Sequence, residues 1–338
     1  MRLRLLRVRL DSSDGDELKR LSAFIEVSRQ ASVFHTFLWN RIVKRVFATD
    51  FTYLAVVDGL AIVGAMPCHI VHQTGGADLC LSPPRTYEVS YGGPLTIGPR
   101  SGAVGEMLVQ GAARLGHRTS VDVFNGPENS SWVENSGLDG LRLETAYVDL
   151  TPDLDDIWIK SLDSKRRNMV RKAQKSGVDV HVCDQSELPE YIDMIAQTAE
   201  RAGFRPQPAD YYSKVLEALS PADGARLYLA RRDGRSLAGG IFLRHGSCCY
   251  YWHGASAADA GNHGQGELLQ WEVIKWARSV GCTLYDLVGV DRERLPNVAL
   301  FKLGFTKQIV PFYHVRYRRM SDRLILKVQR TAAGGSRE

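Results

Sequence analysis

The alternation of apolar and polar residues is most informative in the C-terminal third of the chain. Residues 248–252 form an aromatic, β-rich run of the kind that fills a sheet interior. After a loop of small residues, positions 267–279 carry the apolar spacing of a largely buried helix, which Gly281 ends. Residues 283–288 return as a strand. The pattern therefore predicts a strand, a loop, a helix and a second strand in succession.

The loop inside this stretch carries three glycines, Gly261, Gly264 and Gly266. A glycine loop that leads into a helix directs backbone N–H groups and the positive end of the helix dipole at one point. We expect an anionic group, or a carbonyl that becomes anionic during a reaction, to bind at that point.

The two halves of the chain share an internal repeat. Residues 53–64 and 228–239 each contain a Tyr-Leu-Ala run, an Asp-Gly pair and a closing glycine at identical spacing, and each copy is typical of a β-hairpin. A strand, a helix and a further strand follow in both halves. This order predicts a duplicated α/β (α+β) fold in which helices cover a mixed sheet.

The boundary between the halves is an acidic, proline-bearing segment at residues 151–156, which is typical of a linker. We therefore predict a first domain at 1–150 and a second domain at 151–311. The tail, 312–338, carries a predicted strand and a short basic helix at 321–330. Because the second domain is already closed by residue 305, we expect the tail to complete the first.

Composition narrows the class of protein. The 338 residues suffice for two domains, and 44% hydrophobic with 24% charged residues is ordinary for a globular chain. No run approaches the ~18 apolar residues of a membrane span, and the N-terminus lacks the apolar core of a secretory signal. The six cysteines form no CxxC pair and no metal-ligand spacing. We expect a cytoplasmic protein with reduced thiols and no metal site.

Basic residues concentrate on a predicted helix at residues 158–176, which holds a single acidic residue. A solvated charged face is the simplest interpretation of such a run, but the basic tail helix repeats the pattern. Two basic helices favour a polyanionic partner, either RNA or the phosphates of a lipid headgroup. The candidate RNA-binding residues are Lys165, Arg166, Arg167, Arg171 and Lys175.

Several motifs occur in an order that resembles one known family. Residues 164–178 begin Ser-Lys-Arg-Arg-Asn-Met-Val-Arg-Lys-Ala; Ala-Glu-Arg-Ala-Gly-Phe follows at 199–204, and Phe-Lys-Leu-Gly-Phe at 301–305. Two first-half motifs, at 34–39 and 90–95, fit the same series. Together they resemble the FemAB-like transferases, tandem GNAT-fold proteins best known as peptidoglycan bridge aminoacyltransferases. The long coiled-coil insertion of the staphylococcal members is missing, which puts those enzymes' own substrate in doubt.

The resemblance implies two tandem GNAT-like domains and transfer of an aminoacyl group from aminoacyl-tRNA to an amine, with no bound cofactor. It implies that Lys302 stabilises the oxyanion or the leaving ribose oxygen, with Phe301 packed beside it. It further implies that Arg201 binds a phosphate or carboxylate of the acceptor, with Lys44 as a first-domain partner. Tyr251 would line the channel, and His253 is a further candidate for binding the substrate.

The general base stays open between Asp286 and His253, since proton transfer through water is an alternative. No GxSxG or Cys-His pattern supports a covalent acyl-enzyme, so direct transfer is expected. The acceptor is expected to be a small molecule or a peptidoglycan-precursor-like amine. One alternative is an acyl-coenzyme-A N-acyltransferase in which Gly264 and Gly266 bind the donor phosphates. A further alternative is a non-catalytic RNA- or envelope-binding protein of the same fold.

Overall fold

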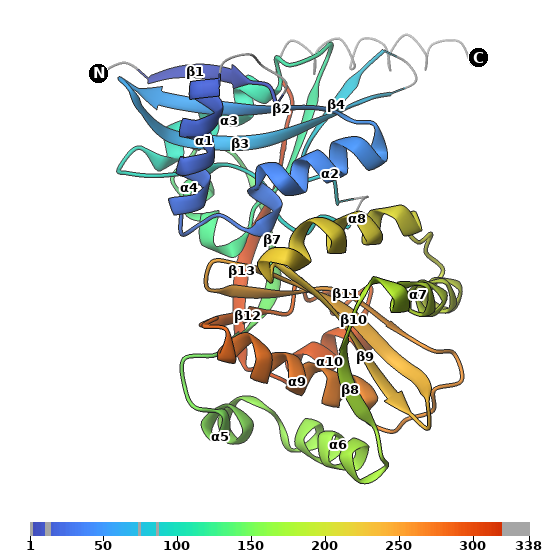
Figure 1. Ribbon diagram of the computed structural model, residues 1–338. Helices are drawn as coiled ribbons and strands as arrows, with labels where there is room; N and C mark the ends of the chain where they lie inside the picture. Colours follow the sequence, from blue (N-terminus) through green and yellow to red (C-terminus); the bar gives the residue numbers. More distant parts are fainter. Residues whose placement is uncertain (1–2, 11–14, 74–75, 86–87, 320–338) are drawn as a thin grey trace, which may run out of the picture. The chain divides into compact units, whose positions relative to one another are not determined.

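The computed structural model describes residues 3–10, 15–73, 76–85 and 88–319 (Figure 1). Contacts divide the chain into two compact units: residues up to Arg142 together with the segment from Phe312 onward, and Leu143–Pro311. The predicted seam after residue 150 lies at the end of strand β7 (Gly140–Asp149), whereas the units divide within that strand. The basic helix predicted at 321–330 lies outside the described residues.

The first unit is a mixed sheet in which β4 and β6 pair in parallel and the other named neighbours pair antiparallel. Its strands, in spatial order, are β1 (Leu3–Val8), β2 (Asp50–Asp58), β3 (Ala61–His72), β4 (Asp78–Ser82), β6 (Ser120–Phe124) and β13 (Gln308–Tyr317), with β5 (Leu95–Thr96) beside β3. Its helices are α1 (Gly15–Val27), α2 (Phe37–Phe47), α3 (Ser101–Ala112) and α4 (Ser131–Glu134).

Both faces of this sheet are buried. Leu54 and Val56 of β2 join a core cluster with α3, while Tyr53 and Ala55 join a cluster with α1. Successive residues of a strand point to opposite faces, so a continuous apolar run requires a helix on each side.

The second unit repeats the arrangement, with β11 and β12 in parallel and the other neighbours antiparallel. Its strands, in spatial order, are β7, β12 (Leu284–Asp286), β11 (Cys248–Ser256), β10 (Arg235–His245), β9 (Ala225–Arg232) and β8 (Asp179–Cys183). Its helices are α5 (Leu154–Asp156), α6 (Ser164–Lys175), α7 (Leu188–Ala202), α8 (Ala209–Leu219), α9 (Gln265–Ser279) and α10 (Pro296–Leu303).

Both predicted hairpins are confirmed, as β2–β3 and β9–β10. The closing glycine of each repeat has a packing reason. A Cβ at Gly64 would lie 2.3 Å from Val104 of α3, and one at Gly239 would lie 2.9 Å from the Tyr191 ring of α7. The glycines therefore let a helix approach the sheet closely in both units.

The predicted helix at 158–176 is divided in two. Residues 157–161 form a π-helical turn, and α6 begins anew at Ser164. Asp163 is the N-cap, because its carboxylate accepts a 2.6 Å hydrogen bond from the Arg166 backbone N–H. Within the described residues, no helix combines the length and apolar character needed to cross a membrane.

A buried polar cluster in the first unit predicts an acid-sensitive stability. His69 Nε2 donates to Asn40 Oδ1 (2.8 Å), His69 Nδ1 accepts from the Thr49 hydroxyl (3.0 Å), and burial lowers the pKa of the ring to about 3. The unfolded state, with a histidine pKa of about 6.5, binds the proton first. Stability contributed by neutral His69 is therefore complete above pH 6.5 and is lost as the pH falls toward 3.

We expect His69→Gln to reduce the loss of unfolding free energy between pH 7.5 and 5 by about 2 kcal/mol, measured by denaturant titration at each pH. His72→Gln is the control. His72 is exposed on the same strand and its pKa is raised by Asp50 and Asp78, so its removal should not lessen the acid loss. Equal pH dependence in wild type and His69→Gln would contradict the assignment.

Candidate functional site

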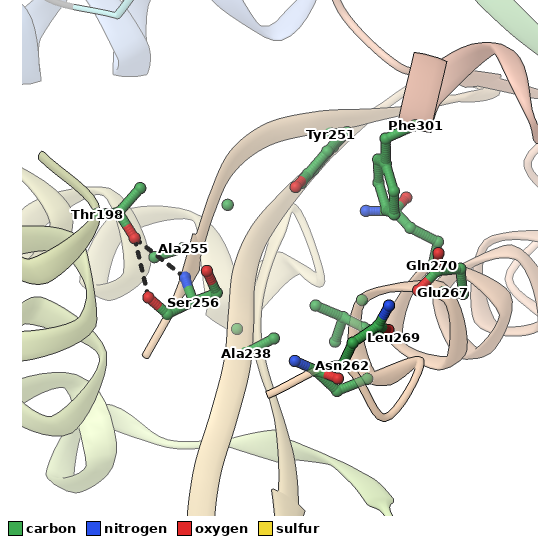
Figure 2. A pocket seen from close by; sticks show the side chains of 14 residues that line it. Thr198, Ala238, Tyr251, Ala255, Ser256, Asn262, Glu267, Leu269, Gln270 and Phe301 are labelled. Atoms are coloured by element: carbon green, nitrogen blue, oxygen red, sulfur yellow. Dashed lines mark hydrogen bonds between the residues drawn. The ribbon is translucent and has the colours of Figure 1, made fainter. Parts of the chain in front are cut away.

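A cavity of about 290 Å³ lies within the second unit (Figure 2). Its wall combines α7, β10, β11, the glycine loop, α9 and α10. Three of the residues singled out from the sequence line it: Tyr251, Gly266 and Phe301. The other polar groups in the wall include Thr198, Ser256, Asn262, Gln265, Glu267 and Gln270.

The cavity lies where the pairing of two parallel strands ends. The register of β11 with β12 ends at Tyr250↔Asp286, so β11 continues beyond its partner from Tyr251 onward. A bulge also interrupts β11, since His253 pairs with Ile241 while Tyr251 pairs with the next residue, Phe242. The bulge therefore lies next to Tyr251, at the wall of the cavity.

Tyr251 places a hydroxyl group at the cavity. Burial raises the pKa of Tyr251 to about 12, so the hydroxyl remains protonated and able to donate a hydrogen bond at neutral pH. A Cβ at Gly254 would lie 2.0 Å from the Tyr251 oxygen. The absence of a side chain at Gly254 therefore leaves the space that the hydroxyl occupies.

Lys302 lies behind Tyr251 rather than in the cavity wall. Its ammonium group is 5.8 Å from the centre of the Tyr251 ring and donates hydrogen bonds to the carbonyl oxygens of Val288 and Gly289, the latter at 2.9 Å. A cation over an aromatic face is attracted by the ring's electron density. The lysine is thus held in one place, with its charge directed at the ring whose hydroxyl reaches the cavity.

Asp286 is not placed as a general base. It is 1% exposed, and its Oδ1 accepts hydrogen bonds from the Thr145 hydroxyl (2.7 Å) and the Val288 backbone N–H (2.8 Å). Val288 has a φ of +52°, an unusual conformation for a β-branched residue. Asp286 therefore holds the strained turn whose carbonyls bind Lys302, which is a positioning role.

Arg166 was predicted to bind RNA, but its side chain is 8% exposed and pairs with Glu267 at 2.7 Å. Its Nη2 also donates to the Leu300 carbonyl at 3.0 Å, and its guanidinium lies 5.2 Å from the centre of the Phe301 ring. A Cβ at Gly304 would lie 2.3 Å from Arg166 Nε. The arginine joins α6, α9 and α10 instead of facing solvent.

Arg167 is also engaged by the protein. Its Nη1 donates to the carbonyls of Leu162 and Ile159, which lie at the end of the preceding turn. Lys165, Arg171 and Lys175 are exposed on α6. The exposed basic surface of this helix is therefore smaller than the sequence pattern predicted, because two of the five arginine and lysine side chains are used for folding.

The two glycines of the loop differ in environment. Gly264 has a φ of +81° as the N-cap of α9, and a Cβ there would lie 2.1 Å from the Met169 carbonyl oxygen. It is required for the close contact of α6 with α9. Gly266 lines the cavity, and a Cβ there would lie in ordinary contact, 3.5 Å from the Phe301 ring.

His253 was predicted to bind substrate or act as a base, but it belongs to the core. It is 9% exposed, and its ring nitrogens lie 2.8 Å from the Tyr191 hydroxyl and 3.5 Å from the Tyr212 hydroxyl. Arg201 is exposed on α7, where its Nη2 donates to the carbonyl and hydroxyl oxygens of Ser256 at 2.7 and 3.0 Å. Ser256 lines the cavity. Lys44 lies on α2 of the first unit, and its role stays a prediction.

Sequence reasoning missed Glu267 and Gln270, which the structure places in the cavity wall. A signal was available. Gln270 is a polar residue among the buried positions Leu268, Leu269 and Trp271 of α9, and Glu267 directly precedes them. A polar residue on the apolar side of a helix is an informative exception to the pattern. Among the described residues, no group of three or more His, Cys, Asp or Glu side chains could hold a metal ion.

Comparison with known sequences gives one family model and several relatives. Residues 163–294 match the model of an acetyltransferase (GNAT) domain. The chain is 31% identical over 146 residues to the UDP-N-acetylmuramoylpentapeptide-lysine N(6)-alanyltransferase of Weissella viridescens, covering 43% of each. It is 22% identical over 229 residues to the lipid II:glycine glycyltransferase of Staphylococcus epidermidis, covering 50% of this chain and 55% of that one. The chain spans about half the length of these curated relatives.

Comparison with solved structures shows the fold. The crystal structure of FemX matches 96% of this chain and 99% of its own, with a TM-score of 0.71 at 15% identity. The C-terminal domain of a putative lysylphosphatidylglycerol synthetase from Agrobacterium fabrum matches 92% and 95%, with a TM-score of 0.57 at 17% identity. The predicted mixed α/β fold with two tandem GNAT-like domains is confirmed.

The Arg166–Glu267 pair provides a stability test. We expect Arg166→Met to destabilise the protein by about 3–5 kcal/mol, because the buried carboxylate of Glu267 would lose its partner. The double variant Arg166→Met/Glu267→Leu should recover much of this loss, since it leaves no buried charge. Denaturant unfolding of wild type, Arg166→Met, Glu267→Leu and the double variant gives the coupling energy of the pair. Additive losses would show that the pair does not interact.

Proposed function

We propose that this FemAB-like chain of the GNAT acyltransferase superfamily is an aminoacyltransferase. It moves an aminoacyl group from aminoacyl-tRNA to the amine of a peptidoglycan-precursor-like acceptor and forms an amide. The observation that carries the proposal is the junction of Tyr251, Phe301 and Lys302, where a fixed ammonium lies 5.8 Å from the centre of a tyrosine ring whose hydroxyl reaches the cavity.

The junction suits the charge that develops during acyl transfer. Attack of an amine on the ester carbonyl gives a tetrahedral intermediate whose oxygen carries negative charge. The Tyr251 hydroxyl would donate to that oxygen, and the field of Lys302 would strengthen the donation through the ring. The new C–N bond replaces the ester C–O bond, and the ribose hydroxyl leaves with a proton. Because Asp286 and His253 are held in the core, the amine proton reaches the leaving oxygen through water.

The proposed donor is supported by the position of α6. This helix packs against α9, which lines the cavity, and exposes Lys165, Arg171 and Lys175. Exposed lysine and arginine bind nucleic acid mainly through backbone phosphates. A charged tRNA held by this surface would have its aminoacyl end close to the cavity. Because that donor is cytoplasmic, the proposal also assigns the chain to the cytoplasm.

The proposed acceptor is supported by Arg201 and by the relatives. The exposed guanidinium of Arg201 lies at the Thr198–Ser256 edge of the cavity. Arginine binds phosphate and carboxylate groups with two parallel hydrogen bonds. The named relatives transfer alanine or glycine to a UDP-linked pentapeptide or to lipid II, and both acceptors are peptidoglycan precursors.

A specific observation also favours an acyl-coenzyme-A donor as a second candidate. Two cationic side chains flank the glycine loop: Lys172 donates to the Asn262 carbonyl at 2.5 Å, and Arg232 lies 3.3 Å from His263 Nδ1. They would suit a diphosphate. The Glu267 carboxylate in the first turn of α9 would repel a diphosphate, although its ion pair with Arg166 neutralises that negative charge. Consumption of acetyl-coenzyme A that ribonuclease does not affect would favour this candidate over the tRNA donor.

We expect Lys302→Ala to lower the rate of aminoacyl transfer by about 10²–10³-fold with little change in acceptor binding, because transition-state stabilisation is lost. The assay follows radiolabelled alanine or glycine from charged tRNA to a UDP-linked pentapeptide. Lys307→Ala, an exposed lysine five positions later, is the control and should be fully active. Unchanged transfer by Lys302→Ala, with basic-surface variants losing RNA binding, would instead favour a non-catalytic binding protein.

We expect the triple variant Lys165→Ala/Arg171→Ala/Lys175→Ala to bind tRNA more weakly. The slope of log affinity against log salt should also fall by about 0.7–0.9 for each phosphate contact removed. Fluorescence anisotropy at several salt concentrations gives both quantities.

The matched control is Lys214→Ala/Arg235→Ala/Lys275→Ala, which removes the same charge from ion pairs elsewhere in the second unit. It should leave tRNA affinity nearly unchanged. An equal loss in both triple variants would show that net charge, and not the α6 surface, governs binding.

A further inference from the structure

Gln270 is a buried amide in the cavity wall. It lies in α9, is 1% exposed, and its Oε1 accepts a hydrogen bond from the Tyr285 hydroxyl. Burial raises the pKa of Tyr285 far above its usual value, so this hydroxyl is protonated and acts as the donor. The contact therefore fixes which end of the amide is oxygen, and the amide nitrogen faces away from Tyr285.

The nitrogen on the other end lies near the Tyr251 oxygen, whose pKa it lowers. Gln270 Nε2 is buried and makes no hydrogen bond of normal geometry within the described part of the chain. Buried N–H groups nearly always have a partner, and a bare one costs free energy. Figure 2 shows the Gln270 amide beside Phe301, while the Tyr251 hydroxyl enters the cavity from β11. The amide has two N–H donors, so an acceptor atom of a ligand in the cavity would complete its hydrogen bonding.

Two donors thus converge from different elements, Gln270 Nε2 from α9 and the Tyr251 hydroxyl from β11. The two groups are close together. Burial raises the pKa of the Tyr251 hydroxyl, and the Gln270 amide beside it lowers that pKa by a smaller amount. Both groups are neutral and keep their protons. Such a pair binds a carbonyl oxygen, and binds it more strongly as the oxygen becomes negative.

We propose that Gln270 is a catalytic residue whose amide nitrogen, with the Tyr251 hydroxyl, binds the carbonyl oxygen of the donor's acyl group. This inference rests on the proposed acyl transfer and assigns the neutral part of its oxyanion site. Lys302 supplies charge from behind Tyr251, and Tyr285 orients the amide from behind Gln270. No proton leaves either donor during the step.

Gln270→Met removes the amide with little change in volume. We expect single-turnover transfer to fall about 10²-fold, with little change in donor affinity, and thermal unfolding to stay cooperative. Combined with Tyr251→Phe, the loss should be less than the product of the two single losses, because both act on one oxygen. Tyr285→Phe is the control. It removes the hydroxyl that orients Gln270 but keeps the amide, so its transfer rate should fall less than that of Gln270→Met.

Gln270→Glu gives a readout that a purely structural residue would not change. The buried carboxyl can still accept from Tyr285, and it can donate toward the cavity only when protonated. Transfer by this variant should rise as the pH is lowered relative to wild type. Wild-type transfer rates in folded Gln270→Met, together with a wild-type pH profile in Gln270→Glu, would overturn the inference and leave the proposed function intact.

A binding measurement separates the inference from the proposed function. The probe is 3′-alanylamino-3′-deoxyadenosine with a ¹³C-labelled carbonyl, a stable mimic of the aminoacyl end. We expect the carbonyl stretch of the probe to have a lower frequency in the wild-type complex than in solution. In the Gln270→Met complex the frequency should return toward the solution value. A wild type that shows this shift but transfers to no amine from tRNA or coenzyme A would refute the function alone. No shift in wild type would refute the oxyanion site.

Discussion

The buried ion pair between Arg166 and Glu267 is the interaction on which the site depends. One guanidinium pairs with Glu267 in the first turn of α9, donates a hydrogen bond to the Leu300 carbonyl and lies 5.2 Å from the centre of the Phe301 ring. It thereby fixes three elements that are far apart in sequence. Pairs of this kind gain little net stability, because desolvation offsets attraction. Their value here is geometric, since removing either partner would leave a charge without compensation beside the cavity.

A second network fixes the cation. Asp286 and Thr145 hold the turn after β12, Val288 takes a left-handed conformation, and the carbonyls of that turn bind Lys302. The lysine therefore has little freedom to leave the Tyr251 ring. Preorganised charge of this kind costs no reorganisation when negative charge appears in a transition state. The strain at Val288 is tolerated because several hydrogen bonds oppose its relaxation.

The duplication explains the symmetry of the fold but not the position of the cavity. Gly64 and Gly239 keep their packing role in both units, so the hairpin and its covering helix are preserved. The cavity described here lies in the second unit, where the register of β11 with β12 ends and the wall gains polar groups from α9. A shared scaffold therefore does not by itself imply a shared site.

Local and periodic features could be predicted from the sequence: the two hairpins, the buried helix after the glycine loop, and Tyr251, Gly266 and Phe301 as candidate residues that the structure places in the cavity wall. The packing of distant elements was needed to show that Arg166, Asp286 and His253 are held inside the protein and that Gln270 lines the cavity. The reason is physical. Periodicity places a side chain on one side of its own element, but burial, pairing and reactivity depend on which distant element packs over that side.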